Sequence, residues 1–135
     1  APRLQQKVKK HELSGDILFK KNVSDKKLAE YYAKSWAFCM PSSGEGQGLV
    51  YSEAMQFGLP VIALKNSPAE ELIDDRESGI LVEQNDAESL TKAIVQILSD
   101  DKMRKKMGAN AQGRYEKFHR ENTFDKTIMK FVGAD

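Results

Sequence analysis

The chain has 135 residues, the length of a single domain. Hydrophobic residues make up 40% of it, charged residues make up 30%, and 21 basic residues nearly balance 20 acidic ones. These values exclude a chain disordered by excess charge. They also disfavour a nucleic-acid partner, because nucleic-acid binders usually carry a strong basic footprint. The longest apolar runs are strand-sized and too short to span a membrane.

In chain order, the sequence predicts short apolar strands separated by helices. The first half is expected to contain a helix over 3–12, a strand over 17–19, a helix from the N-cap Ser24 to about Lys34, and a strand over 36–40. The second half is expected to contain a helix over 49–57 closed by Gly58, and strands over 60–64 and 79–82 around a short helix over 69–74. It should end with a helix capped by Asn85 or Asp86 and running to about Leu98, a helix opened by Asp100 or Asp101, and a last helix over 123–132. Continuously apolar strands with helices between them are typical of a parallel sheet covered on both faces. We therefore predict an α/β fold, a Rossmann-like doubly wound sheet with at least four parallel strands.

The cysteine content limits the compartment and the metal chemistry. Cys39 is the single cysteine, which excludes an internal disulfide and a cysteine-based zinc site. We expect a cytoplasmic protein, because the first twelve residues lack a signal peptide's apolar stretch and the cysteine usage suits a reducing compartment. Local lysine clusters leave open a peripheral contact with anionic lipid. Cys39 and Trp36 are both interpreted as core residues of the strand over 36–40.

Residues 41–48 form the one glycine-rich loop of the sequence, between a predicted strand and a predicted helix. In open parallel sheets, ligands lie outside the carboxyl ends of the strands. Gly46 and Gly48 allow a ligand to approach the backbone closely. The N–H groups of Gln47, Gly48 and Leu49 at a helix start favour an anion such as phosphate. The alternative is a glycine-rich connection that binds nothing.

Two glutamates flank this predicted phosphate site. Glu45 lies in the loop and Glu53 lies one helical turn beyond Leu49. A carboxylate accepts two hydrogen bonds at once, which suits a vicinal diol. The order of diol acceptor, diphosphate site and diol acceptor matches a nucleotide sugar. The alternative is that Glu45 is a solvated loop charge and Glu53 is a partner of the helix dipole.

The same stretch resembles a known family signature. Residues 41–63 read PSSGEGQGLVYSEAMQFGLPVIA, with seven residues between Glu45 and Glu53. This is similar to the signature of GT-B glycosyltransferases of family 4, the group 1 glycosyl transferases. The resemblance covers roughly residues 13–131. The chain departs from the family at Gln47, where an aromatic residue is usual, and at Lys21, where glycine is frequent.

The resemblance implies a fold and a reaction. Residues 1–135 would be the C-terminal, donor-binding domain of a retaining glycosyltransferase that needs neither a metal nor a cofactor. The enzyme would transfer a sugar from a nucleotide-diphosphate sugar to an acceptor glycan or lipid, as in polysaccharide biosynthesis. The implied roles are catalytic for Glu45, donor-binding for Gly46, Gln47, Gly48, Leu49 and Glu53, and base-binding for Lys21, Asn22 and Val23.

The predicted element order also suggests that the chain is a fragment. It opens on a helix, whereas doubly wound sheets usually begin with a strand. We therefore expect the first strands and the acceptor domain to precede residue 1, and the 135 residues alone to be inactive. The alternatives are a module that binds a nucleotide or sugar without catalysis, and a flavodoxin-like interaction domain. A dinucleotide site is disfavoured because Leu49 stands where the third fingerprint glycine would be.

Overall fold

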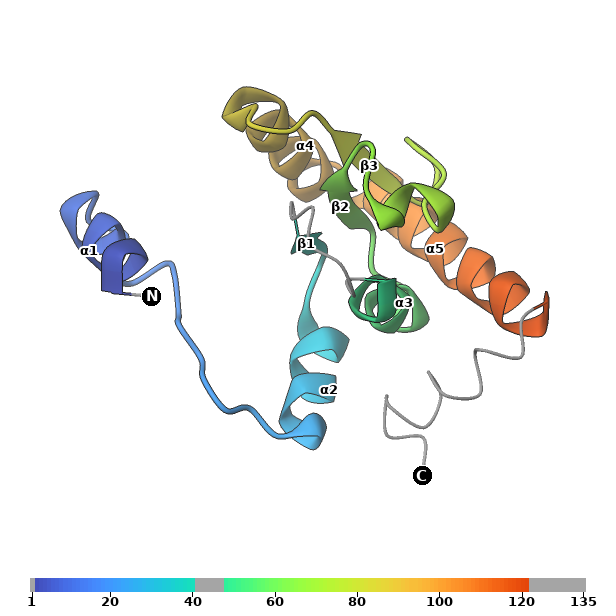
Figure 1. The fold of residues 1–135 in the computed structure, drawn as a ribbon, viewed down its shortest axis with the longest axis horizontal. Helices are drawn as coiled ribbons and strands as arrows, with labels where there is room; N and C mark the ends of the chain where they lie inside the picture. Colours follow the sequence, from blue (N-terminus) through green and yellow to red (C-terminus); the bar gives the residue numbers. More distant parts are fainter. Residues whose placement is uncertain (1, 41–47, 122–135) are drawn as a thin grey trace.

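The computed structural model describes residues 2–40 and 48–121, which form a three-stranded sheet flanked by helices (Figure 1). In chain order the elements are α1 (Pro2–Lys10), α2 (Asp25–Lys34), β1 (Phe38–Met40), α3 (Gly48–Gln56), β2 (Val61–Leu64), the 3-10 helix η1 (Pro68–Glu71), β3 (Gly79–Val82), α4 (Ala87–Ser99) and α5 (Asp101–Glu121). The predicted α/β alternation is confirmed. The helix expected over 123–132 and most of the glycine-rich loop lie outside the described residues.

The sheet is parallel, with β2 in the middle. On one side Phe38 of β1 lies opposite Val61 of β2, and on the other side Ile62 of β2 lies opposite Ile80 of β3. Every residue of β2 is buried. The predicted parallel pairing of the strands that contain Phe38 and Val61 is therefore confirmed.

Helices cover both faces of the sheet. Alternate strand residues point to opposite faces, so Val61 and Ala63 pack in one core with α2, α3 and the later part of α5. Ile62 and Leu64 pack in a second core with α4 and Met107 of α5. The doubly wound arrangement predicted from the apolar strands is confirmed, because a strand buried on both faces needs a helical layer on each side.

Local chemistry sets the helix ends where the sequence predicts them. The Lys27 N–H donates to Oγ of the N-cap Ser24 at 3.2 Å, and the Ser89 N–H donates to Oδ1 of the N-cap Asp86 at 3.0 Å. Gly58 follows α3 with a φ of 72°. This left-handed conformation is one that glycine adopts without a steric cost, which ends α3 and turns the chain into β2.

Residues 17–19 do not form the predicted strand. Leu18 is 74% exposed, and Ile17 and Phe19 are also exposed. The segment between α1 and α2 has no regular structure and runs apart from the sheet in Figure 1. A strand needs a neighbour to pair its backbone N–H and C=O groups, and an apolar run supplies none by itself. The sheet within the described residues therefore has three strands and not the four predicted.

The strand expected over 36–40 is shorter and less buried than predicted. It begins at Phe38, and Trp36 is 56% exposed, with the Arg104 guanidinium 4.1 Å from its ring centroid. Cys39 is exposed and not a core residue. The reason is that β1 is an edge strand, so helix α4 covers its side chains only in part. The short helix expected over 69–74 is the 3-10 helix η1.

Candidate functional site

The structure describes six of the nine predicted site residues. Glu45, Gly46 and Gln47 lie outside the described residues. Gly48 and Leu49 begin α3, so their backbone N–H groups belong to the first helical turn. The N–H groups of that turn have no intrahelical acceptor, as the prediction of an anion site requires.

Tyr51 holds the start of α3 against the end of β1. Its side chain is fully buried, and its hydroxyl donates to the carbonyl oxygen of Met40 at 3.1 Å. Phe38 packs edge-on against the Tyr51 ring, with centroids 6.2 Å apart. This contact joins the two elements on either side of the glycine-rich loop. The helix start therefore lies at the carboxyl end of β1, where ligands of open parallel sheets bind.

Glu53 is a buried carboxylate with a specific partner. It is 3% exposed, and the hydroxyl of Tyr32 on α2 donates to its Oε2 at 3.1 Å. Glu53 lies beyond the first turn of α3, which holds no acidic residue. The interpretation of Glu53 as a simple dipole partner is therefore wrong. Helix α3 thus carries a buried charged group, and buried charged groups are rare in proteins unless they are paired or functional.

The surroundings of Glu53 oppose its charge in part. Burial raises the pKa of Glu53 above its ordinary value of 4.5, the hydrogen bond from Tyr32 lowers it, and the charge of Asp25 raises it further. Burial first, and then the neighbouring Glu53, raises the pKa of the Tyr32 hydroxyl well above its usual value. Tyr32 therefore keeps its proton at neutral pH and remains the donor of this hydrogen bond.

Aromatic packing immobilises Tyr32. Its ring stacks on Phe57 at a centroid distance of 5.4 Å, with an interplanar angle of 20°. Phe38 closes on it at 5.9 Å with a tilt of 50°. Sequence reasoning missed Tyr32 as a site residue. Tyr31 and Tyr32 are adjacent in the sequence, and only the structure distinguishes them, because Tyr31 is 37% exposed and Tyr32 is 7% exposed.

The predicted base-binding residues lie next to α2 in the chain. Lys21 and Asn22 are exposed and Val23 is half-buried, in an irregular segment that leads into the N-cap Ser24. Asn22 has a φ of 54°, a left-handed conformation that asparagine tolerates better than most residues. The segment thus enters the helix that carries Tyr32. Contact between residues 21–23 and a base stays a prediction.

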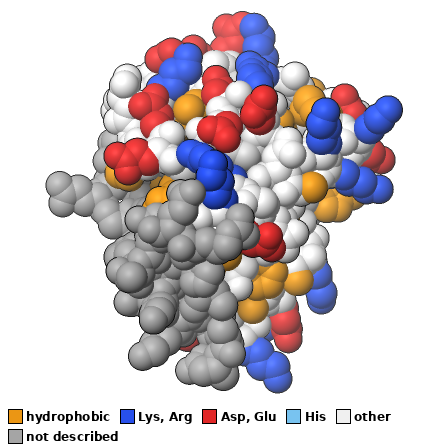
Figure 2. All heavy atoms as spheres, turned by 90° about the vertical axis from the view of Figure 1, so that its right-hand side faces the viewer, with side chains coloured by type: hydrophobic (Ala, Val, Ile, Leu, Met, Phe, Trp, Pro, Cys, Tyr) orange, Lys and Arg blue, Asp and Glu red, His pale blue; other side chains and the backbone are white. Residues whose placement is uncertain are grey.

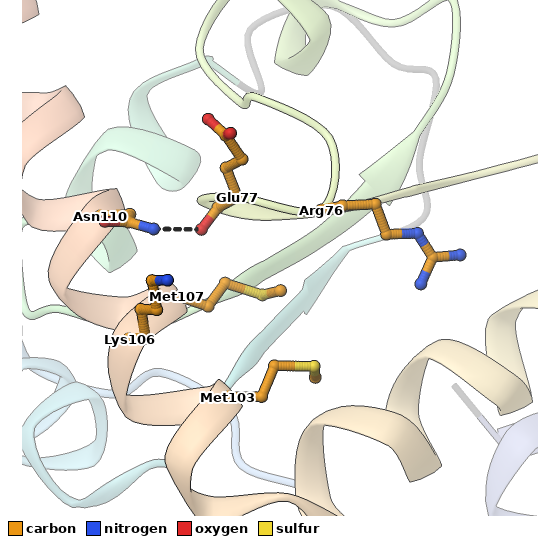
Figure 3. A pocket seen from close by; sticks show the side chains of 6 residues that line it. All are labelled: Arg76, Glu77, Met103, Lys106, Met107 and Asn110. Carbon is orange, nitrogen blue, oxygen red and sulfur yellow. Dashed lines mark hydrogen bonds between the residues drawn. The ribbon is translucent and has the colours of Figure 1, made fainter.

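A separate hollow of about 500 Å³ lies at the other end of the sheet (Figure 3). It lies between α5 and the turn before β3, where the side-chain amide of Asn110 donates to the carbonyl oxygen of Glu77 at 2.9 Å. Its lining residues are Arg76, Glu77, Met103, Lys106, Met107 and Asn110. Because β3 begins there, this hollow is at the amino ends of the strands and is not the predicted donor site.

One face of the described surface has mixed charge. Figure 2 shows one face on which basic and acidic side chains lie side by side, so that the described residues there form no single-sign patch. Within residues 2–40 and 48–121, no cluster of three or more histidine, cysteine or acidic side chains is arranged to hold a metal ion. No helix in these ranges has the length and apolar character needed to cross a membrane.

Solved structures define the class of fold. The C-terminal domain of a glycosyl transferase group 1 family protein, LpcC from Francisella tularensis, superposes with a TM-score of 0.78 at 31% identity. That match covers 86% of this chain and 60% of the other. HepE from Anabaena, solved with UDP-glucose, has a TM-score of 0.80 at 23% identity, over 99% of this chain and 36% of the other. The fold is that of the C-terminal domain of GT-B glycosyltransferases.

Sequence comparison gives the family. The model for glycosyl transferases group 1 matches residues 2–114, and the chain belongs to this family. O-antigen chain mannosyltransferase B of Escherichia coli is 32% identical over 128 residues, which are 95% of this chain and 33% of that protein. The chain spans 21% to 35% of the length of three curated relatives that it matches. The family predicted from the two-glutamate signature is thus confirmed.

Proposed function

We propose that this chain binds the nucleotide-diphosphate sugar of a retaining glycosyltransferase that works without a metal. One observation carries the proposal. Glu53 is a buried carboxylate held by Tyr32, on a helix that begins at the carboxyl end of the sheet. Membership of the group 1 family supports a glycosyltransferase activity. The UDP-glucose complex of HepE, which has the same fold, supports a nucleotide sugar as the ligand.

Each part of the donor has a proposed partner. Glu53 accepts hydrogen bonds from the two ribose hydroxyls, because an ionised carboxylate has only acceptor atoms. The first turn of α3 donates N–H groups to the diphosphate. Glu45 contacts hydroxyls of the donor sugar close to the bond that breaks. The proposed diphosphate partners are Gly46, Gln47, Gly48 and Leu49, and the proposed base partners are Lys21, Asn22 and Val23.

The proposed reaction moves the sugar with retention at its anomeric carbon. The bond from this carbon to the diphosphate oxygen breaks, and a bond to an acceptor hydroxyl oxygen forms on the same face of the sugar. The hydroxyl proton and the negative charge both end on the leaving diphosphate. The N–H groups of the first turn of α3 stabilise that charge as it develops, which lowers the barrier. An acceptor glycan or lipid would bind outside these 135 residues.

The test compares the two glutamates in the natural-length protein. Calorimetry measures affinity for UDP, GDP and ADP, and steady-state assays measure turnover of the matching nucleotide sugars. Glu53→Ala should weaken nucleoside diphosphate binding about tenfold to a hundredfold, because a hydrogen bond to a charged group contributes about 1.5–3 kcal/mol. Glu45→Ala should leave this affinity nearly unchanged and lower kcat, because its contact belongs to the reacting sugar.

An exposed glutamate on α5 provides the matched control. Glu116→Ala removes the same side chain far along the sequence from the site and should change neither affinity nor turnover. If Glu45→Ala and Glu53→Ala give the same pattern, the assignment of two separate roles is wrong. Tight binding of a nucleotide sugar without turnover on any acceptor would favour the alternative, a non-catalytic binding module.

A further inference from the structure

We propose that Tyr32 is a positioning residue for the donor nucleotide. Its hydroxyl holds the carboxylate of Glu53 in one orientation, so that the remaining acceptor capacity of that carboxylate is set for the ribose diol before the ligand arrives. This inference rests on the proposed role of Glu53 as the ribose acceptor. It assigns a function to helix α2, from which the glycosyltransferase signature of residues 41–63 takes no residue.

The geometry of the pair supports a holding role. The Tyr32 hydroxyl donates to Oε2 of Glu53 at 3.1 Å, and both residues are buried, at 7% and 3% exposure. Phe57 and Phe38 pack against the Tyr32 ring, so the phenol has little freedom to move away. A glutamate side chain otherwise has several rotamers. The hydrogen bond therefore selects one of them in the free protein.

This selection favours binding through preorganisation. A side chain that is already ordered loses less conformational entropy when the ligand binds, which strengthens the affinity. An ionised carboxylate has about four acceptor positions, and the bond from Tyr32 occupies one of them. The carboxylate keeps capacity for two more donors, which is the number of hydroxyls in a ribose diol. A hydrophobic residue at position 32 would fill the same space but would leave Glu53 without its donor.

The hydrogen bond also favours the ionised form of Glu53. Burial and the nearby Asp25 both raise the pKa of Glu53, and the Tyr32 hydrogen bond lowers it. Only the ionised carboxylate accepts at both oxygens, whereas a protonated carboxyl group would turn one oxygen into a donor. Tyr32 thus supports both the orientation and the protonation state that a diol requires. Its neighbour Tyr31 is more exposed, at 37%.

The experiment measures a preference for the ribose diol. Using the natural-length protein, calorimetry compares the tightest-binding of UDP, GDP and ADP with its 2′,3′-dideoxy counterpart. The wild type should prefer the ribose form about tenfold to a hundredfold. Tyr32→Phe removes only the hydroxyl and should reduce this preference about threefold to tenfold. The loss should come from weaker binding of the ribose form, with the dideoxy form unchanged.

Two further variants show whether the effect passes through Glu53. Tyr31→Phe makes the same chemical change one residue earlier and should keep the wild-type preference. In a Glu53→Ala background the acceptor of the Tyr32 hydroxyl is gone, so adding Tyr32→Phe should change the preference less than it does in the wild type. The preference is a ratio of two affinities in one sample. It is therefore insensitive to a partial loss of folded protein, which thermal unfolding measures separately.

The outcomes separate this inference from the proposed function. If Glu53→Gln abolishes the preference and Tyr32→Phe retains it, Tyr32 has no positioning role and the ribose assignment stands. If Tyr32→Phe weakens both ligands equally, Tyr32 is a structural residue only and the inference is overturned. If the wild type binds both ligands equally, the ribose role of Glu53 is wrong and the role of Tyr32 falls with it.

Discussion

Glu53 combines a structural cost with the chemistry proposed for the site. Its carboxylate is 3% exposed, and burial is the first cause that raises its pKa above 4.5. Between 4.5 and the raised pKa, the folded protein therefore binds more protons at this residue than the unfolded chain does. The free energy of unfolding must then decrease as the pH rises through this window. The hydrogen bond from Tyr32 offsets a part of this decrease.

This linkage predicts the effect of Glu53→Gln on stability. Glutamine has a similar size and accepts the same hydrogen bond from Tyr32, but it has no charge to desolvate. The variant should be more stable than the wild type at pH 7, and the gain should shrink as the pH falls through the raised pKa of Glu53 towards 4.5, below which it no longer changes with pH. Urea unfolding at several pH values measures the difference. Glu116→Gln, at an exposed position on α5, is the control and should show no such trend.

If the difference in free energy of unfolding between Glu53→Gln and the wild type were the same at every pH, the folded protein would not oppose the charge of Glu53. Higher stability of Glu53→Gln at pH 7, together with the weaker nucleotide binding expected of this variant, would mark a site where function is kept at the expense of stability.

At the scale of elements, helix α5 packs against the end of α3 and against η1. Gly108 packs directly against the backbone of Gly58, the turn that ends α3. One turn later, the Gln112 side chain donates to the carbonyl oxygen of Gln56 at 3.2 Å. Arg114 donates to the backbone carbonyls at the end of η1 at 3.1 and 3.3 Å. Helix α5 thus fixes the last turn of α3 and the 3-10 helix behind the sheet.

Two glycines of α5 provide a matched prediction. A Cβ at Gly108 would overlap the carbonyl oxygen of Gly58, whereas a Cβ at Gly113 would meet nothing within 4 Å. Gly108→Ala should therefore destabilise the protein by about 1–3 kcal/mol through overpacking. Gly113→Ala should stabilise it by about 0.5–1 kcal/mol, because alanine is the better helix former. Chemical denaturation measures both. If Gly108→Ala left the free energy of unfolding unchanged, helix α5 would be able to move away from α3.

The prediction of secondary structure from the sequence failed for one predicted strand, because a strand depends on a neighbouring strand to pair with. Helix ends at Ser24, Gly58 and Asp86 follow from caps and a left-handed glycine, which act within a few residues. Residues 17–19 carry the same apolar signal as β2, yet only β2 lies between two partner strands. The short apolar run around Phe38 pairs with β2 but lies at the edge of the sheet, so its paired residue Cys39 stays exposed.

At the scale of the molecule, the chain corresponds to one part of its relatives. It spans 21% to 35% of the length of three curated relatives, and its fold matches the C-terminal domain of LpcC. The family resemblance implies that the acceptor binds to a second domain outside these residues. The same resemblance implies that the basic side chains that neutralise the diphosphate lie upstream of residue 1. Two carboxylates close to a diphosphate would otherwise repel it.

If donor and acceptor bind to different domains, the behaviour of residues 1–135 produced alone can be predicted. They should transfer no sugar from UDP, GDP or ADP sugars to any acceptor, and they should not hydrolyse these donors. The physical reason is that proximity of donor and acceptor supplies a large share of the rate enhancement in group transfer. Chromatographic product assays measure both reactions, with the natural-length protein as the positive control. Turnover by the 135 residues would contradict the two-domain interpretation.

The sequence by itself determined the family, the parallel α/β order and the helix caps, and it singled out Glu53 as a candidate donor-binding residue. These features depend on short-range spacing, which the chain carries in its order of residues. Only the tertiary structure decided that Tyr32 and not Tyr31 is buried against Glu53, and that residues 17–19 stay outside the sheet. The reason is that burial and pairing arise between elements distant in sequence. Tyr32 and Glu53 are 21 positions apart, and no periodic signal in the sequence joins them.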